Sequence, residues 1–168
     1  MKKSLLLLPA FVIATCLAAS SSLAAEPFQG KFVSNGKSHP LTFAGVFKTE
    51  QEGRNDDYED VMLDVLKVVL TEKAPAAGQA LSHELVDSNA LGSYVVATFD
   101  AGSLKHLSDS LGGPDMRASI NYGGGGALQA EGIALEKGVL SGRLHSEGEE
   151  DIFGEKLDID ATFSVKVE

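Results

Sequence analysis

Apolar and polar residues alternate without a break near the C-terminus, in Leu157-Asp158-Ile159-Asp160-Ala161-Thr162-Phe163-Ser164-Val165-Lys166-Val167. Because successive side chains of a strand point to opposite faces, this run predicts a strand with one apolar and one polar face. No helical period fits it, and its Val, Ile, Thr and Phe content suits a half-buried pleated surface. A strand of about 11 residues spans about 36 Å, which indicates strong twist, a bend or a barrel wall.

Shorter segments of strand-like composition precede this run and are separated by turn-forming residues. They are 28–34, 41–47, 61–70, 93–99, 116–122, 127–135 and 139–145. Segment 61–70 fits a valine-striped helix or a buried strand, and we interpret it as a strand because turn chemistry ends it. Segment 104–111 is ambiguous, and one short helix is expected around 79–85.

The chain is therefore predicted to be mainly β, an antiparallel β-barrel or β-sandwich of about 7–9 strands with at most one or two short helices. Pairing of the first strand, 28–34, with the last, 157–167, would close the sheet and leave no exposed edge. The choice between barrel and sandwich stays open.

The N-terminus has the pattern of an export signal, with Lys2 and Lys3, an apolar stretch over 5–17 and the small-x-small sequence Ser22-Leu23-Ala24. We expect a signal peptide at 1–24, cleaved there or one residue later, and a single β-rich domain at 25–168 in the periplasm or outside the cell. The apolar stretch is shorter than the roughly 20 residues of a membrane-spanning helix, so no transmembrane segment is expected after signal removal. A lipoprotein anchored through Cys16 is a minor alternative.

Composition excludes several classes of chemistry. Cys16 is the only cysteine, so the expected mature chain has no disulfide, thiolate nucleophile or cysteine zinc ligand. The formal charge of −10 becomes −12 without Lys2 and Lys3 (−10 − 2 = −12). Since nucleic-acid binding depends on clustered Lys and Arg, no nucleic-acid partner is expected.

Metal and carboxylate chemistry remains open. The histidines His39, His83, His106 and His145 include no pair at i, i+2 or i, i+4, the spacings that place two ligands on one face. His145 is the best single candidate because it precedes an acidic segment. We expect solvated loops at 50–60 and 147–151 that lack the calcium-loop spacing, and nothing shows the carboxylate separation that a glycosidase needs. No cofactor is expected.

Three other motifs have little chemical content. Gly36-Lys37-Ser38 lacks the glycine of a phosphate-binding loop, because that position is Lys31. Ser34-x-x-Lys37 has the spacing of penicillin-recognising enzymes without their helical setting. The glycines of 123–126 suit a loose turn, or less favourably a ligand-adapting loop.

Turn and strand sequences give the chain a resemblance to small secreted bacterial β-rich proteins of uncharacterised function. The shared sequences are Phe-x-Gly-x-Phe at 28–32, Asn-Gly-Lys at 35–37, the strand end 70–73, Gly-Arg-Leu at 142–144 and the segment 153–160. The resemblance covers about a third of the chain and implies no catalytic or binding residue.

We expect a non-catalytic, monomeric binding or interaction protein rather than an enzyme, with an unknown small molecule or an envelope protein as partner. An apolar ligand would require space among Phe43, Phe47, Phe99 and Phe163. One alternative is an inhibitor or protective protein for an envelope enzyme that acts through its acidic loop, including Asp56, Asp57, Glu59 and Asp60. The other is a metal- or carboxylate-dependent hydrolase.

Overall fold

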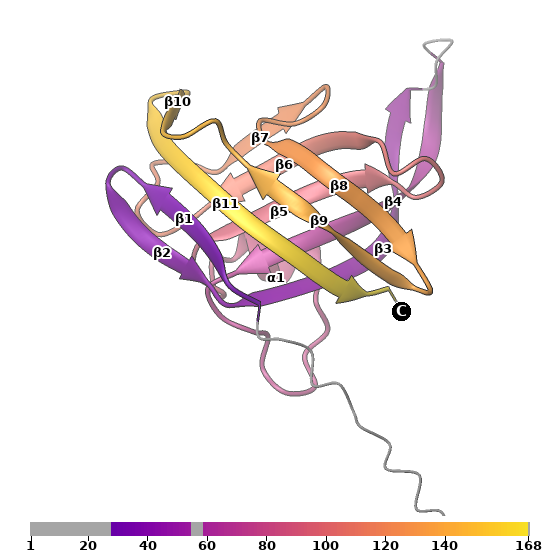
Figure 1. Cartoon of the computed structure of the whole chain (residues 1–168), viewed down its shortest axis with the longest axis horizontal. Helices are drawn as coiled ribbons and strands as arrows, with labels where there is room; N and C mark the ends of the chain where they lie inside the picture. Colours follow the sequence, from indigo (N-terminus) through magenta and orange to yellow (C-terminus); the bar gives the residue numbers. More distant parts are fainter. Residues whose placement is uncertain (1–27, 55–58, 168) are drawn as a thin grey trace, which may run out of the picture.

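The computed structural model describes residues 28–54 and 59–167. The expected signal peptide at 1–24, Cys16, and the acidic residues Asp56 and Asp57 lie outside the described residues. The described chain is mainly β, with eleven strands and one short helix in two antiparallel sheets (Figure 1). The predicted fold class is confirmed. The arrangement is a sandwich rather than a closed barrel, and its strands outnumber those expected because short strands flank the turns.

The six-stranded sheet is built around the C-terminal strand β11. In spatial order it contains β2 (Lys37–Leu41), β1 (Gly30–Ser34), β11 (Glu155–Lys166), β9 (Val139–His145) and β8 (Gln129–Glu136), with β10 (Glu150–Ile152) paired to the start of β11.

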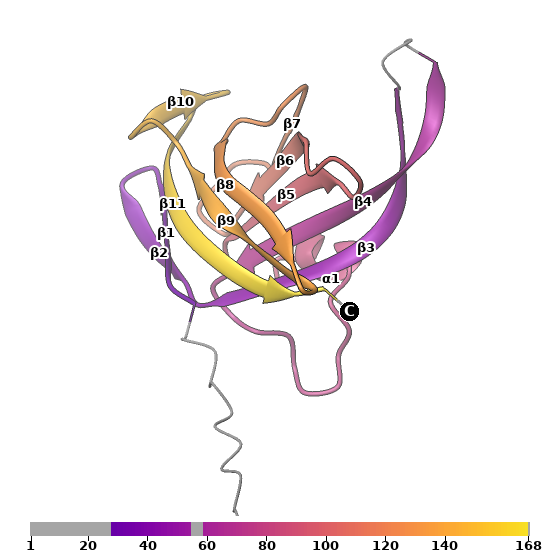
Figure 2. The ribbon, with the colours of Figure 1, turned by 45° about the vertical axis from the view of Figure 1, so that its right-hand side comes forward.

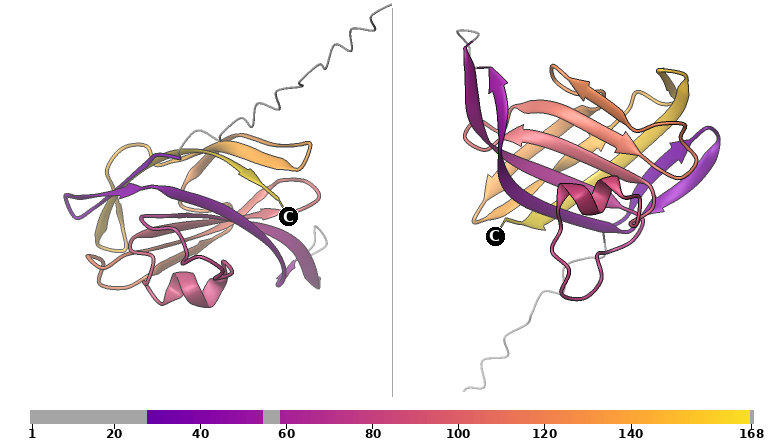
Figure 3. Two further views of the ribbon diagram at one scale, coloured as in Figure 1. Left: turned by 90° about the horizontal axis from the view of Figure 1, so that it is seen from below. Right: turned by 180° about the vertical axis from the view of Figure 1, so that it is seen from behind.

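The five-stranded sheet follows the chain order. It contains β3 (Phe43–Arg54), β4 (Asp60–Thr71), β5 (Tyr94–Asp100), β6 (His106–Gly112) and β7 (Ile120–Gly123). The helix α1 (His83–Asp87) lies against the outer face of this sheet, as the view from behind in Figure 3 shows. Among the described residues, no helix has the length and hydropathy to cross a bilayer.

The alternation in β11 is confirmed, because its apolar side chains are buried and Ile159 and Phe163 are only 1% and 2% exposed. The pairing of first and last strands is also confirmed, with register from Gly30↔Ala161 to Ser34↔Leu157. The expected closure of the sheet is wrong. The chain passes from β2 into β3 at Thr42 and changes sheet there, and β7 pairs only with β6 while β8 pairs only with β9.

Apolar side chains of both sheets fill the space between them. The central cluster includes Phe32, Phe99, Phe163, Leu140 and Leu157, each at most 2% exposed. Phe99 and Phe163 are therefore part of a packed core and do not line an interior pocket, which counts against a carrier of apolar ligands.

A second cluster attaches α1 to the outer face of the five-stranded sheet. Val86 of the helix packs with Val69, Val96 and Tyr94 of the sheet. Phe47 is partly buried against this cluster. The side chain of Ser82 begins the helix by accepting a hydrogen bond from Leu85 N.

Some segment boundaries differ from expectation. Glu50 and Glu52 belong to β3, and Glu150 and Asp151 to β10, so the two acidic segments are not simply loops. Charged residues are compatible with a strand when their side chains face water. The charge of a residue does not by itself distinguish such a strand from a loop. The ambiguous segment 104–111 contains β6, and the short helix begins at His83 rather than near 79.

The outer parts of β3 and β4 form a two-stranded arm. Strand β5 pairs with β4 only over Val65–Thr71, whereas the β3–β4 ladder continues to Arg54↔Asp60. Residues 50–54 and 60–64 therefore project beyond the sandwich (Figures 1 and 2). Met62 in this arm is 58% exposed.

Candidate binding site

Each of the four histidines contacts a carboxylate. His83 Nδ1 is 2.7 Å from Asp87 on the surface of α1, and His145 Nε2 is 3.3 Å from Glu131. His145 Nδ1 lies 3.1 Å from the carbonyl of its neighbour Ser146. The acidic segment after His145 does not converge on its ring, so the sequence-based preference for His145 as a ligand gains no support.

His39 connects β2 to two loops. Its Nδ1 is 2.7 Å from Glu72, and its Nε2 lies 3.1 Å from Asp115 at ion-pair distance without hydrogen-bond geometry. Lys37 also binds Asp115, at 2.5 Å, and this contact leads the interactions that hold the pKa of Asp115 below its ordinary value. The arrangement joins the two sheets at one corner and opens onto none of the cavities described below.

His106 and Asp109 form a buried pair on β6. His106 Nε2 is 2.8 Å from Asp109 Oδ1, and Asp109 Oδ2 accepts a hydrogen bond from Leu128 N at 2.9 Å. The ring of His106 stacks on Phe99, with centroids 5.1 Å apart. A Cβ on Gly126 would stand 2.3 Å from both Asp109 Oδ2 and the His106 ring. The last glycine of 123–126 is therefore tightly packed, whereas Gly124 and Gly125 meet nothing within 4 Å.

In the described ranges, no group of three or more His, Cys, Asp or Glu side chains is placed to hold a metal ion. The four histidines lie on different elements. His83 and His106 pair with carboxylates of their own elements, whereas His39 and His145 contact carboxylates of other segments, and the four do not assemble a common centre.

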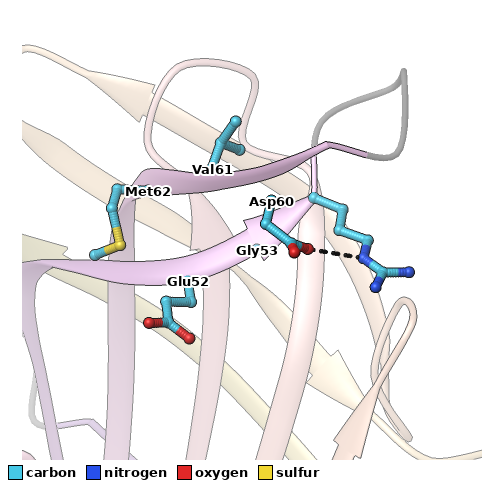
Figure 4. A pocket seen from close by; sticks show the side chains of 6 residues that line it. Glu52, Gly53, Asp60, Val61 and Met62 are labelled. Carbon is cyan, nitrogen blue, oxygen red and sulfur yellow. Dashed lines mark hydrogen bonds and ion pairs between the residues drawn. The ribbon is translucent and has the colours of Figure 1, made fainter.

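Among the four cavities described below, the largest lies on the arm and has a volume of about 560 Å³. It is lined by Glu52, Gly53, Arg54, Asp60, Val61 and Met62 (Figure 4). Arg54 Nε donates to Asp60 Oδ1 at 3.0 Å across the ribbon. This cavity is a shallow depression on the two-stranded arm. Residues 55–58, which follow Arg54 in the sequence, lie outside the described chain.

A second region lies where β7 faces the turn between β10 and β11. The rings of Tyr122 on β7 and Phe153 in the turn are 6.4 Å apart. We call the surface between β7 and this turn, which carries both rings, the aromatic seam. Phe153 is 79% exposed and Tyr122 is 41% exposed.

Two cavities adjoin Phe153 in the aromatic seam. The Arg117 cavity, of about 390 Å³, is lined by Arg117, Ala118, Ser119, Ile120, Asn121, Phe153 and Glu155. The Glu150 cavity, of about 310 Å³, is lined by Tyr122, Gly126, Ala127, Glu150, Asp151, Ile152 and Phe153. Ile120 and Asn121 line the first cavity and Tyr122 lines the second, so the two cavities follow one another along β7.

The backbone of Phe153 is unusual for its residue type. Three two-residue turns have positive φ at both positions: Asn35-Gly36 (51° and 78°), Lys137-Gly138 (51° and 78°) and Phe153-Gly154 (54° and 84°). This is the pattern of a type I′ hairpin turn, which favours Asn-Gly. A bulky aromatic residue at positive φ is a conformational outlier.

Glu155 fixes the floor of the Arg117 cavity. It is 4% exposed, and it accepts hydrogen bonds from Asn35 Nδ2 at 2.5 Å and from Arg117 N at 3.1 Å. These two bonds, that of Asn35 first, hold the pKa of Glu155 below its ordinary value. The Arg117 side chain makes no ion pair or hydrogen bond with another described residue, so its guanidinium donors remain available in the cavity, and its charge contributes to the lowered pKa of Glu155.

Sequence reasoning did not find the aromatic seam. It assigned no site to 153–156, and it singled out His145, which pairs elsewhere. The available signal was a Phe-Gly dipeptide between two strand-forming runs, at a position where Asn-Gly is the expected turn.

No protein-family model, curated protein or solved structure matches this chain.

Proposed function

We propose that this chain is a non-catalytic binding protein of the periplasm or the extracellular space. Its partner would be an extended segment of another polypeptide, bound along β7 with Phe153 as its aromatic anchor. The observation that carries the proposal is the combination of exposure and positive φ at Phe153. Strained backbone conformations are enriched at functional sites, and at Phe153 the strain coincides with an exposed aromatic side chain.

The edge formed by β7 suits the addition of a strand. Sheet edges are usually protected by proline, charge or bulges, and the other edges have such features: Pro40 in β2, the irregularity between Glu131 and Ala134 in β8, and alternating charges in the outer part of β3. Strand β7, Ile-Asn-Tyr-Gly, has none of these protective features, and only its short length of four residues limits pairing at this edge. Beyond its ladder with β6, its backbone makes no hydrogen bond with another described residue.

The two cavities provide side-chain recognition for such a segment. In an extended chain, side chains i and i+2 lie on one face, about 6.6 to 7 Å apart. Two such side chains of a bound strand would enter the Arg117 cavity and the Glu150 cavity. Main-chain hydrogen bonds then supply affinity, and the pockets for alternate side chains supply specificity.

Charge defines the expected partner sequence. Arg117 favours an acidic side chain in one cavity, while Glu150 and Asp151 favour a basic side chain in the other. An apolar or aromatic residue would stack on Phe153. The net charge of −10 favours the approach of a cationic partner overall.

The experiment is selection from a displayed random peptide library with the folded chain, counter-selected against Phe153→Asn. We expect peptides that contain an apolar residue with acidic and basic neighbours, and we expect their addition to shift the backbone amide NMR signals of Ile120–Gly123. Phe153→Tyr should retain binding, and Arg117→Gln should weaken it selectively for peptides with an acidic residue. Lys137→Asn, in the equivalent turn, is the matched control. Equal binding by wild type and Phe153→Asn would contradict the proposal.

A second candidate function is inhibition or protection of an envelope enzyme through the acidic arm. The projection of the β3–β4 ribbon with Met62 exposed favours it. It predicts affinity that falls with added salt and on neutralisation of Asp60 and its acidic neighbours. Such binding would be insensitive to Phe153→Asn, which separates the two candidates.

A further inference from the structure

A separate cavity lies on the outer face of the five-stranded sheet. Its volume is about 260 Å³, and it is bounded by His83 of α1 on one side and by β7 on the other. The strand register places Lys67, Thr98 and Ser108 directly opposite one another on β4, β5 and β6. Directly opposed residues of an antiparallel pair have Cβ atoms about 4.5 to 5.5 Å apart, so their polar groups share one small region.

Lys67 is the only lysine of the described chain that is not exposed. It forms no ion pair with a described carboxylate, whereas Lys31, Lys37, Lys48 and Lys156 each do. Burial lowers its pKa, and the charge of Asp87 opposes this effect only in part. Four exposed lysines, Lys73, Lys105, Lys137 and Lys166, also form no ion pair with a described carboxylate, so Lys67 is distinguished by its burial. Asp109 also lines the cavity, but its two carboxylate oxygens are bound to His106 Nε2 and Leu128 N.

Several hydroxyl and amide groups around Lys67 have no hydrogen-bond partner among the described residues. Thr98 is 4% exposed and lines the cavity, and its hydroxyl bonds to no other described side chain or backbone group. The same holds for the hydroxyls of Ser108 and Ser110 and for the amide of Asn121, which is opposite Ser110. Buried polar groups are normally satisfied. Of these residues only Thr98 is buried, whereas Ser108 and Ser110 are partly buried and Asn121 is exposed, so the unpartnered hydroxyl of Thr98 beside the half-buried Lys67 is the observation that indicates an acceptor.

We propose that this cavity binds a small oxyanion, the carboxylate or phosphate group of a ligand. The ammonium of Lys67 supplies the charge, and the hydroxyls of Thr98, Ser108 and Ser110 donate hydrogen bonds to the anion's oxygens. The small volume accommodates a single anionic group rather than a drug-sized molecule, whose pockets span about 300 to 1,000 Å³. The cavity meets the aromatic seam at β7, where Asn121 and Tyr122 line both surfaces. Lys67, Thr98 and Ser108 lie outside the seam, so anion binding is measured at Lys67 with no peptide present.

The test uses the chain with ¹³C-labelled lysine and follows the ¹³Cε signal of Lys67 by NMR. Inorganic phosphate and acetate are titrated in parallel at constant ionic strength, with chloride as the balancing salt. We expect a saturable shift with a dissociation constant of the order of 1 mM and a rise in the pKa of Lys67. Saturation by phosphate alone assigns a phosphate site, and saturation by acetate extends the site to carboxylates.

Two near-isosteric variants test the hydroxyl contribution without removing the lysine. Thr98→Val and Ser108→Ala should each weaken binding at least threefold, and Lys67→Met should abolish it. Lys105→Met changes an exposed lysine and should leave it intact. A Lys67 shift that is linear in anion concentration and no larger than that of Lys105 would overturn the proposal, as would unchanged affinity in both hydroxyl variants.

Discussion

Replacing Phe153 by asparagine should leave the free energy of unfolding almost unchanged, although it removes a large aromatic side chain. The ring is 79% exposed, so only about a fifth of a side-chain area of about 200 Å² is covered by the protein. At about 25 cal/mol per Å², loss of about 40 Å² of buried area costs about 1 kcal/mol. Asparagine tolerates positive φ, and relief of the strain at φ 54° returns about 1 kcal/mol.

The matched control is Lys137→Asn, at φ 51° in the one other of the three two-residue turns that lacks asparagine at its first position. Lys137 is exposed, so this variant measures the turn contribution by itself, and we expect it to raise stability by about 0.5 to 1 kcal/mol. Urea unfolding of wild type and both variants at 25 °C gives the comparison. For scale, truncating a fully buried phenylalanine such as Phe163 to alanine should cost about 3 to 5 kcal/mol.

The result that refutes the reasoning is a loss of more than about 2 kcal/mol in Phe153→Asn alongside a gain in Lys137→Asn. The ring of Phe153 would then be a structural contact of the fold, and its exposure would no longer argue for a partner.

Three further predictions concern the fold itself. Gly126→Ala should lose about 2 to 4 kcal/mol in urea unfolding, because its Cβ would meet the His106 ring at 2.3 Å and its φ is +81°; Gly125→Ala, in open space, should lose less than half as much. Ser82→Ala removes the N-cap of α1 and should cost about 1 kcal/mol, seen as a lower urea midpoint. Glu155→Gln should destabilise the chain at neutral pH. The lowered pKa of Glu155 means that its stabilisation is present above the ordinary value of 4.5 and is lost as pH falls through the folded-state pKa, so urea midpoints of variant and wild type should converge in acid, and a constant difference would contradict this.

The local sequence pattern was sufficient to predict the strands that have one buried face. The alternation around Ile159 and Phe163 requires a strand whatever surrounds it, and edge protection correctly suggested that the first strand is its neighbour. Local pattern failed in the arm, because Glu50 and Glu52 are unfavourable for a generic strand. They are acceptable there only because that part of β3 is a two-stranded ribbon in water.

The candidate sites depend on relations that no local pattern encodes. Phe153 is exposed because the turn after β10 faces β7 across the open side of the sandwich, and that position follows from the topology of both sheets. Lys67 lies within a run correctly interpreted as a strand, but its position beside Thr98 and Ser108 follows from the register of β4, β5 and β6. The sequence identifies these residue types without showing that they meet.

The antiparallel ladder between Gly30–Ser34 and Leu157–Ala161 has a consequence for how the molecule acquires its structure. A nascent chain cannot form these pairs until residues 157–161 have left the ribosome, long after Gly30–Ser34. Such high contact order belongs to slow folding, on the scale of milliseconds to seconds. Until then β1 and β9 both lack their shared neighbour, so the six-stranded sheet is expected to form only after β11 has emerged.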